Sequence, residues 1–181
     1  LHSAQQHFKA KKPAHWQPSQ GRPRNLKELF YRKMFLCAKN TRSIIAVSGP
    51  IDVITDGENT VLLRNGCATM ARITGSGCML TSLIGTFCGS NKYDYFSAVC
   101  SAVAVMGISG ELAEIKRLKN GTGNATFRTD LIDAVFNMNK EELINFLDEY
   151  IESLEPKKKK AYLKKNHNLC IKRWVVDAVE N

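Results

Sequence analysis

Short hydrophobic runs between residues 43 and 66 predict β-strands. The run SIIAVSG, residues 43–49, is rich in β-branched residues and ends in glycine, which is typical of a strand buried on both faces. We therefore expect a parallel strand at the centre of a sheet. Residues 51–66 alternate short apolar runs with the turn signals DGEN and NG, and this pattern predicts a β-hairpin.

From Gly77 onward the hydrophobic period is that of a helix. A first helix is predicted to end near Gly89, because apolar side chains recur at spacings of three and four residues, at Met79, Leu80, Leu83, Ile84 and Phe87. A second helix is predicted from its cap Asp94 to about Lys116. Its first half is almost continuously apolar and rich in Ala, Ser and Gly, so we expect it to be buried and closely packed.

Two further helices are predicted after the loop KNGTGNAT. The third starts near Phe127, and the fourth follows Asn139, where KEELINFLDEYIESLE is amphipathic. No hydrophobic period stands out after residue 156, and that part of the chain is left without an assigned element.

The charge is concentrated at the two ends of the 181-residue chain, whose net charge is +9. Residues 1–43 hold ten Lys and Arg against one acid, residues 44–156 hold eight against fourteen, and residues 157–181 hold eight against two. The first 26 residues show no apolar periodicity and bury too little surface to offset the entropy of ordering. We therefore predict a basic, flexible segment over 1–43, a folded core over 44–156 and a basic tail over 157–181.

Several classes of protein are disfavoured by the sequence. The N-terminus lacks the apolar region of a secretory signal, and no stretch approaches the ~18 apolar residues of a membrane-spanning helix. The six cysteines form no Cys-x-x-Cys pair and have no histidine at ligand spacing, which argues against a zinc site and a disulfide framework. Cys88 and Cys100 lie in apolar helical stretches and are expected to be small buried hydrophobes. We expect a cytoplasmic protein without a membrane partner.

The motif TGSG before the first predicted helix is the strongest chemical candidate. Two glycines let a backbone approach a ligand closely, and the first N–H groups of a helix have no partner within the helix. Gly75, Ser76 and Gly77 therefore form a candidate anion hole, with a positive φ expected at Gly77. Cys78 follows in the first turn, where the positive end of a helix favours the thiolate over the thiol. An ordinary strand-to-helix turn with an inert cysteine is the alternative that spacing alone leaves open.

Three stretches, SIIAVSGPIDVITDG, RNG…ITGSGCMLTSLIGTFCG and AVMGISGELA…GTGNATFRTDLIDAVFNMN, together resemble the C-terminal half of the hydroxyethylthiazole kinase family, from about residue 44 to 150. The resemblance implies a ribokinase-like α/β fold, a three-layer sandwich with a mostly parallel central sheet, apparently truncated at its N-terminus. Nothing of the family's N-terminal half is recognised in residues 1–43. The family carries Cys where other ribokinase-like enzymes carry Asp, and that residue is Cys78. Cys67 stands where the family has His.

The resemblance implies ATP-dependent phosphorylation of the primary alcohol of 4-methyl-5-(2-hydroxyethyl)thiazole, with Mg²⁺, in thiamine biosynthesis or salvage. Ser48 would contact ATP, Gly75 would contact the thiazole, and Cys78 would be the catalytic residue nearest the hydroxyl. No metal ligand is assigned in this chain. The resemblance also implies a homotrimer.

Two other functions are compatible with the sequence. In the first, a catalytically dead remnant or interaction protein binds RNA or another acidic partner through its basic ends, since clustered positive charge gives salt-sensitive binding. The flanks carry no zinc-finger or aromatic RNA-binding motif, which disfavours a nucleic-acid partner. In the second, the chain is another ribokinase-like kinase or a related ATP-dependent dehydratase, which the cysteine at position 78 disfavours.

Overall fold

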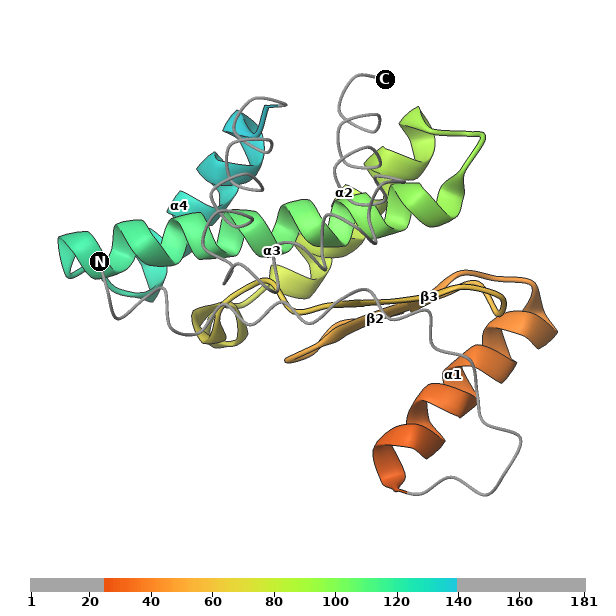
Figure 1. Ribbon diagram of the computed structural model, residues 1–181. Helices are drawn as coiled ribbons and strands as arrows, with labels where there is room; N and C mark the ends of the chain where they lie inside the picture. Colours follow the sequence, from red (N-terminus) through yellow and green to blue (C-terminus); the bar gives the residue numbers. More distant parts are fainter. Residues whose placement is uncertain (1–24, 140–181) are drawn as a thin grey trace, which may run out of the picture.

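The computed structural model describes residues 25–139, which form a small antiparallel sheet with helices packed against it (Figure 1). The strands are β1 (Ile45–Val47), β2 (Asp52–Thr55) and β3 (Thr60–Leu63), in the order β1-β2-β3. The helices are α1 (Leu26–Thr41), α2 (Ser76–Ser90), α3 (Tyr95–Asn120) and α4 (Asn124–Asn137), with the short 3-10 helix η2 (Ala68–Arg72) before α2. The fold class is mixed α/β.

The predicted hairpin is confirmed as β2 and β3. The two strands pair from Asp52 opposite Leu63 to Thr55 opposite Thr60. Asp56 closes the turn, because its Oδ1 accepts hydrogen bonds from the backbone N–H groups of Glu58 and Asn59, at 2.8 and 2.6 Å. The side chain of Asp56 thus supplies the acceptors that the tight turn needs.

The prediction of a central parallel strand over residues 43–49 is wrong for the described residues. Strand β1 lies at the edge of the sheet and pairs antiparallel with β2, with Ile45 opposite Thr55. Ala46 and Val47 are exposed. The turn SGPI between β1 and β2 reverses the chain, so β1 hydrogen bonds to the strand that follows it. A β-branched run predicts a strand, but it does not identify the neighbouring strand. A mostly parallel sheet is not seen within residues 25–139.

Helix α1 contradicts the prediction of a flexible segment over residues 1–43. Its N-terminus is capped by Asn25, whose Oδ1 accepts a hydrogen bond from the N–H of Glu28 at 2.9 Å. Met34 and Ala38, four residues apart on one face, are buried. The high charge of this segment concealed that helical spacing. Residues 1–24 of the predicted segment lie outside the described residues.

The helix predicted from Gly77 and the one capped by Asp94 are confirmed as α2 and α3. Asp94 caps α3 by accepting a hydrogen bond from the N–H of Ser97 at 3.0 Å. The predicted apolar face of α2 packs on α3, with Leu80 and Ile84 against one buried cluster and Leu83 and Phe87 against the next. Cys100 is buried in the first of these clusters and Cys88 packs against it, as expected of small hydrophobes.

Helix α3 is long and apolar enough to cross a membrane, contrary to the expectation that no stretch approached that length. Within the described residues, however, 89% of its apolar window is buried. A core helix of a folded domain passes the same test of length and composition, so this property is weak evidence for a membrane span. The residues from Ser97 to Glu111 are all buried by the rest of the protein.

The third predicted helix is α4, which begins three residues before the expected Phe127. Phe127 and Leu131 are fully buried, and they pack with Met106 and Ala113 of α3. The fourth predicted helix after Asn139 and the predicted basic tail lie outside the described residues.

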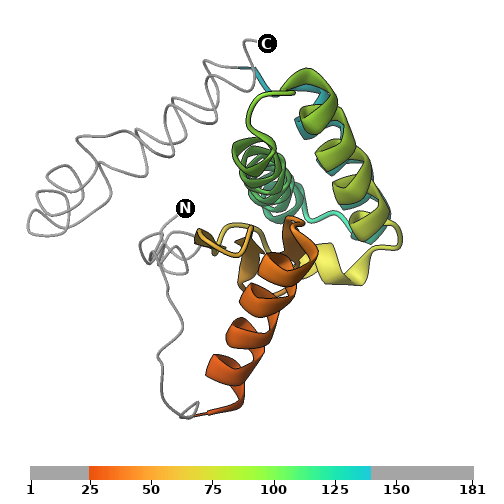
Figure 2. The same cartoon turned by 90° about the vertical axis from the view of Figure 1, so that its right-hand side faces the viewer.

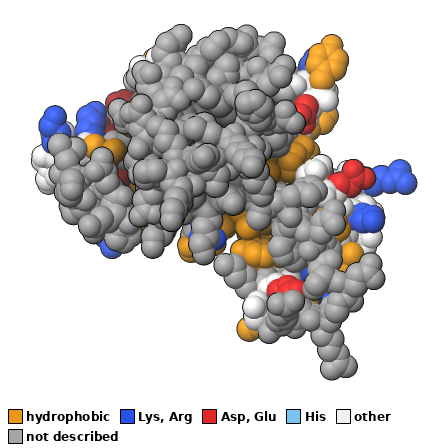
Figure 3. Space-filling view, viewed as in Figure 1, with side chains coloured by type: hydrophobic (Ala, Val, Ile, Leu, Met, Phe, Trp, Pro, Cys, Tyr) orange, Lys and Arg blue, Asp and Glu red, His pale blue; other side chains and the backbone are white. Residues whose placement is uncertain are grey.

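Helices α2, α3 and α4 lie together on one side of the sheet, and α1 lies on the other (Figures 1 and 2). Hydrophobic side chains are visible toward the centre of the space-filling view, between α1 and the other helices (Figure 3). The β2–β3 turn is in close contact with α1. A Cβ atom at Gly57 would lie 2.5 Å from the backbone nitrogen of Lys39.

The substitution Gly57→Ala tests whether α1 is part of the folded core. Gly57 has a φ of +87°, so an alanine there is strained and also collides with the α1 backbone. We expect a loss of at least about 2 kcal/mol in the free energy of unfolding, measured by urea denaturation. Gly85→Ala is the control, because Gly85 lies inside α2 with no atom within 4 Å of its Cβ position. It should stabilise the protein by up to ~1 kcal/mol. Equal stabilities would contradict the docking of α1.

Candidate active site at the start of helix α2

The N-terminus of α2 is formed by the predicted motif. Gly75 is the N-cap, with φ 95° and ψ −1°, and its carbonyl accepts a hydrogen bond from the N–H of Met79 at 2.9 Å. No side chain caps this end of the helix. The N–H groups of Ser76, Gly77 and Cys78 point along the helix axis and have no acceptor within the helix. The arrangement suits an anion.

The positive φ predicted for Gly77 belongs instead to Gly75. Gly77 is already inside the first turn of α2 and has ordinary helical geometry. The chain needs its left-handed residue where it turns into the helix, and that position is the N-cap. No atom lies within 4 Å of the Cβ position of either glycine, so the backbone is open to approach at both.

A hollow of about 270 Å³ lies between strands β1 and β2 and helix α2. Its polar lining comes from Ser48, Asp52 and Thr81, together with the backbone of Gly77, and the remaining lining residues are apolar: Ala46, Val47, Ile54, Leu80, Ile84 and Val103. The structure thus brings together Ser48 and Gly77, which were predicted for different roles. Gly75, Ser76 and Cys78 do not line this hollow, and the Cys78 side chain is exposed.

Asp52 and Thr81 are site residues that the sequence analysis missed. The Oδ1 of Asp52 accepts a hydrogen bond from the N–H of Gly49 at 2.9 Å and so closes the turn that carries Ser48. Burial raises the pKa of the Asp52 carboxyl above its ordinary value. Thr81 donates its hydroxyl to the carbonyl of Gly77 at 3.0 Å. The signal for Asp52 was its place three residues after a Gly-Pro turn begins, which is typical of an acceptor for turn N–H groups.

A search for clusters of metal-ligating side chains finds none in the described part of the chain: within residues 25–139, no group of three or more His, Cys, Asp or Glu side chains could hold a metal ion. The hollow offers a ligand backbone amides, hydroxyls and the carboxyl of Asp52.

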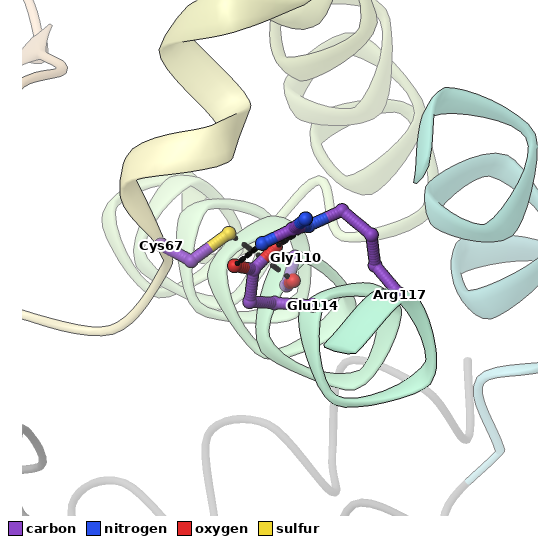
Figure 4. Close-up of polar contacts among 4 residues, drawn as sticks. All are labelled: Cys67, Gly110, Glu114 and Arg117. Carbon is purple, nitrogen blue, oxygen red and sulfur yellow. Dashed lines mark hydrogen bonds and ion pairs between the residues drawn. The ribbon is translucent and has the colours of Figure 1, made fainter. Parts of the chain in front are cut away.

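The segment that leads from β3 to α2 is bound to α3 by hydrogen bonds at its start. Asn65 donates its Nδ2 to the carbonyl of Ala104 at 2.7 Å, and the N–H of Gly66 donates to Oε1 of Glu111 at 2.7 Å. The Cys67 thiol contacts the carbonyl of Gly110 at 3.4 Å (Figure 4). The first part of this segment is therefore fixed to the central helix.

Burial dominates the electrostatics of this region. It raises the pKa of the Glu111 carboxyl to about 8, against an ordinary value of 4.5. Burial also raises the pKa of the Cys67 thiol. Glu114, one turn further along α3, has a lowered pKa because Arg117 binds both of its carboxylate oxygens, at 2.8 and 2.7 Å (Figure 4). Burial thus favours the protonated form of Glu111, whereas the contacts with Arg117 favour the ionised form of Glu114.

Comparison with known proteins decides the family. The model of the hydroxyethylthiazole kinase family matches residues 25–141. The chain belongs to the hydroxyethylthiazole kinase family. It is 46% identical over 101 residues to the hydroxyethylthiazole kinase of Clostridium beijerinckii. The aligned residues make up 56% of this chain and 36% of that protein. It is 45% identical over 109 residues to hydroxyethylthiazole kinase 2 of Methanosphaera stadtmanae, covering 60% of this chain and 38% of the relative.

A solved structure agrees with this assignment. The hydroxyethylthiazole kinase protein from Pyrococcus horikoshii OT3 superposes with a TM-score of 0.54 at 27% identity, over 62% of this chain and 42% of the other. The chain thus spans little more than a third of the length of the curated relatives it matches. The family match begins at residue 25, which is earlier than the start near residue 44 that the sequence predicted, and it includes α1.

The two glycines of the family motif should respond differently to substitution. Gly75→Ala places a Cβ at a φ of +95°, which should cost about 1–2 kcal/mol of unfolding free energy. Gly77→Ala adds a Cβ to an ordinary helical residue with open space around it, and stability should stay equal or rise by up to ~1 kcal/mol. Chemical denaturation of both variants checks this. A larger loss of unfolding free energy in Gly77→Ala than in Gly75→Ala would instead place the positive φ at Gly77, as the sequence predicted.

The buried Glu111 makes stability depend on pH. In the folded protein this carboxyl keeps its proton up to about pH 8, whereas in the unfolded chain it releases the proton near pH 4.5. Between these values unfolding releases a proton, so the stabilisation is fully present below pH 4.5 and is lost as pH rises through 8. We expect the free energy of unfolding to fall by a few kcal/mol between pH 5 and pH 9. Glu111→Gln should flatten that dependence, and an unchanged profile in this variant would refute the assignment to Glu111.

Proposed function

We propose that this chain forms the phosphate-binding side of a hydroxyethylthiazole kinase. The reaction is transfer of the terminal phosphoryl group of ATP to the primary alcohol of 4-methyl-5-(2-hydroxyethyl)thiazole, in thiamine biosynthesis or salvage. One observation supports the proposal beyond family membership: Ser48 and Gly77, a residue of the first turn of α2, line the same hollow. A nucleotide contact and an anion hole must be neighbours in such an enzyme.

The backbone amides at the start of α2 are the main catalytic element of this proposal. Negative charge spreads over the oxygens of a phosphoryl group during transfer, and fixed N–H dipoles stabilise that charge. The N–H groups of Ser76, Gly77 and Cys78 are oriented by the helix, so little reorganisation is needed when the charge moves. Gly75 provides a backbone surface without a side chain, where the thiazole approaches the moving group.

Ser48 acts on the nucleotide side of the hollow. Its hydroxyl lies on the β1–β2 turn, which Asp52 holds closed through the N–H of Gly49. Ser48 would therefore contact ATP from a turn of fixed shape, while Thr81 adds a second hydroxyl to the same hollow. Holding the two reactants in alignment contributes much of the rate in phosphoryl transfer.

Cys78 is the proposed catalytic side chain. It lies in the first turn of α2 and its thiol is exposed, so a substrate hydroxyl can reach it. The hydroxyl loses its proton as its oxygen bonds to phosphorus, and Cys78 accepts that proton or orients the hydroxyl for the attack.

ATP and Mg²⁺ are the cofactors of the proposed reaction. Mg²⁺ would neutralise the negative charge of the phosphates. We further propose that the protein is a cytoplasmic homotrimer. Its core would begin with α1 rather than at residue 44, and the basic ends of the chain would be additions to that core.

The function is tested by phosphoryl transfer from radiolabelled ATP to the thiazole alcohol, using the full 181-residue chain with Mg²⁺. Cys78→Ser should reduce turnover by ~10²-fold, because it removes the group that handles the proton. Cys78→Asp should retain measurable turnover, since a carboxylate accepts a proton well. Cys37→Ser is the matched control, as Cys37 is an exposed cysteine on α1, away from the hollow.

Alkylation gives a second readout that does not depend on turnover. ATP together with the thiazole alcohol should slow the reaction of Cys78 with iodoacetamide, while Cys37 reacts at its usual rate, as followed by mass spectrometry. Equal turnover of the wild-type and Cys78→Ser proteins would remove the catalytic role of Cys78. Absence of both transfer and protection would refute the proposed function.

A further inference from the structure

The carboxyl of Glu111 is buried in the middle of the protein, with 9% of the residue exposed. Its Oε1 accepts the N–H of Gly66 at 2.7 Å, a contact between residues 45 positions apart. Burying a carboxyl costs free energy unless hydrogen bonds replace its hydration. An apolar side chain would fill the same space without that cost, so the carboxyl contributes something besides volume.

The surroundings of Glu111 match a neutral carboxyl. Its Oε2 and the Oδ1 of Asn65 are both buried and have no hydrogen-bond partner among the described residues. Asn65 is packed tightly on α3, since a Cβ at Gly107 would lie 2.2 Å from its Nδ2. Gly107 is one turn before Glu111 on α3, so Asn65 and Glu111 occupy the same face of the helix. Burial favours the protonated state of this carboxyl, and a proton on Oε2 would give that buried atom a hydrogen to donate.

Glu111 binds the start of the segment whose end forms the proposed phosphate site. We call residues 64–75, between β3 and α2, the connector. Past Gly66, its residues Cys67, Met70 and Ile73 pack on the buried cluster that contains Phe127. Its last residue is Gly75, the N-cap of α2. A fixed start and a packed middle leave the connector little freedom in where it delivers Gly75.

We propose that Glu111 is a positioning residue, which ties Gly66 to α3 and thereby fixes the path of the connector into the first turn of α2. The acceptor atom Oε1 is what matters, and the negative charge is not needed. An effect of Glu111 on catalysis rests on the proposed kinase function, whereas its role in fixing the path of the connector does not.

Two conservative variants separate placement of the acceptor from charge. Glu111→Gln keeps an oxygen at the Oε1 position and has no charge. Glu111→Asp keeps the ionisable carboxyl but withdraws it by one methylene. If the acceptor position matters, the glutamine variant behaves as wild type and the aspartate variant does not. If the charge matters, the aspartate variant behaves as wild type and the glutamine variant does not. If only the polarity of the side chain matters, the two variants behave alike.

Hydrogen exchange followed by mass spectrometry on the full chain measures the tie directly. Peptides from the connector should exchange about tenfold faster in Glu111→Asp, as expected for a lost buried hydrogen bond, and at the wild-type rate in Glu111→Gln. Glu58→Gln is the control, because Glu58 is an exposed acid on the hairpin turn. An aspartate variant that fails to fold, beside a folded glutamine variant, also supports the proposal. Fast exchange or unfolding in Glu111→Gln, or wild-type exchange in Glu111→Asp, overturns it.

The transfer assay distinguishes this proposal from the proposed function. Suppose that the connector exchanges faster in Glu111→Asp but that even the wild-type chain transfers no phosphate. The proposed contact between Glu111 and Gly66 is then supported, and the kinase function is refuted. Suppose instead that the connector exchanges at the wild-type rate in Glu111→Asp and that the chain does transfer phosphate. The positioning role of Glu111 is then refuted, and the kinase function is supported. If both proposals hold, turnover falls in Glu111→Asp and is rescued in Glu111→Gln.

Discussion

Burial of helix α3 is the constraint on which the rest of the structure depends. Every residue from Ser97 to Glu111 is buried, so the helix needs neighbours on all sides. Strands β2 and β3 supply Ile54 and Val61 on one side, and α2 and α4 cover others. The small residues of α3 permit this close approach. A Cβ at Gly110, for example, would lie 2.4 Å from the Met70 sulfur, so η2 is seated directly on the helix.

The polar contacts of the connector follow from that packing. Gly66 lies against α3, and its backbone N–H donates to the carboxyl of Glu111 on that helix. Burial of that carboxyl raises its pKa to about 8. The connector then runs over α3 to the N-terminus of α2. Contacts between the connector and the buried helix α3 therefore determine where the candidate anion site lies.

The hollow beside α2 lies at the periphery of the same core. Its lining is mostly apolar, with Ser48, Asp52, Thr81 and Gly77 as the polar contributors. The exposed surface of β1 lies next to it, and the chain covers only 36% to 38% of the curated kinases described above. This part of the family fold therefore provides one wall of the candidate site.

The sequence by itself determined the elements whose signals are local. Helical spacing identified α2 and α3, an aspartate cap located the start of α3, and turn residues identified the hairpin. The motif around Gly75 and the family were recognisable for the same reason, since glycines and caps act within a few residues. The sequence failed for α1, whose buried Met34 and Ala38 are spaced as in a helix but lie among charged residues.

Only the tertiary structure decided which elements meet. The partner of β1 and the contact between Gly66 and Glu111 each depend on how distant segments pack. An edge strand and a central strand have similar sequences, because their difference lies in their neighbours. Glu111 read alone is a charged residue in an apolar helix, and its role appears only when a backbone N–H from 45 residues away needs an acceptor. Hydrogen-bond partners across the core are not encoded in local spacing.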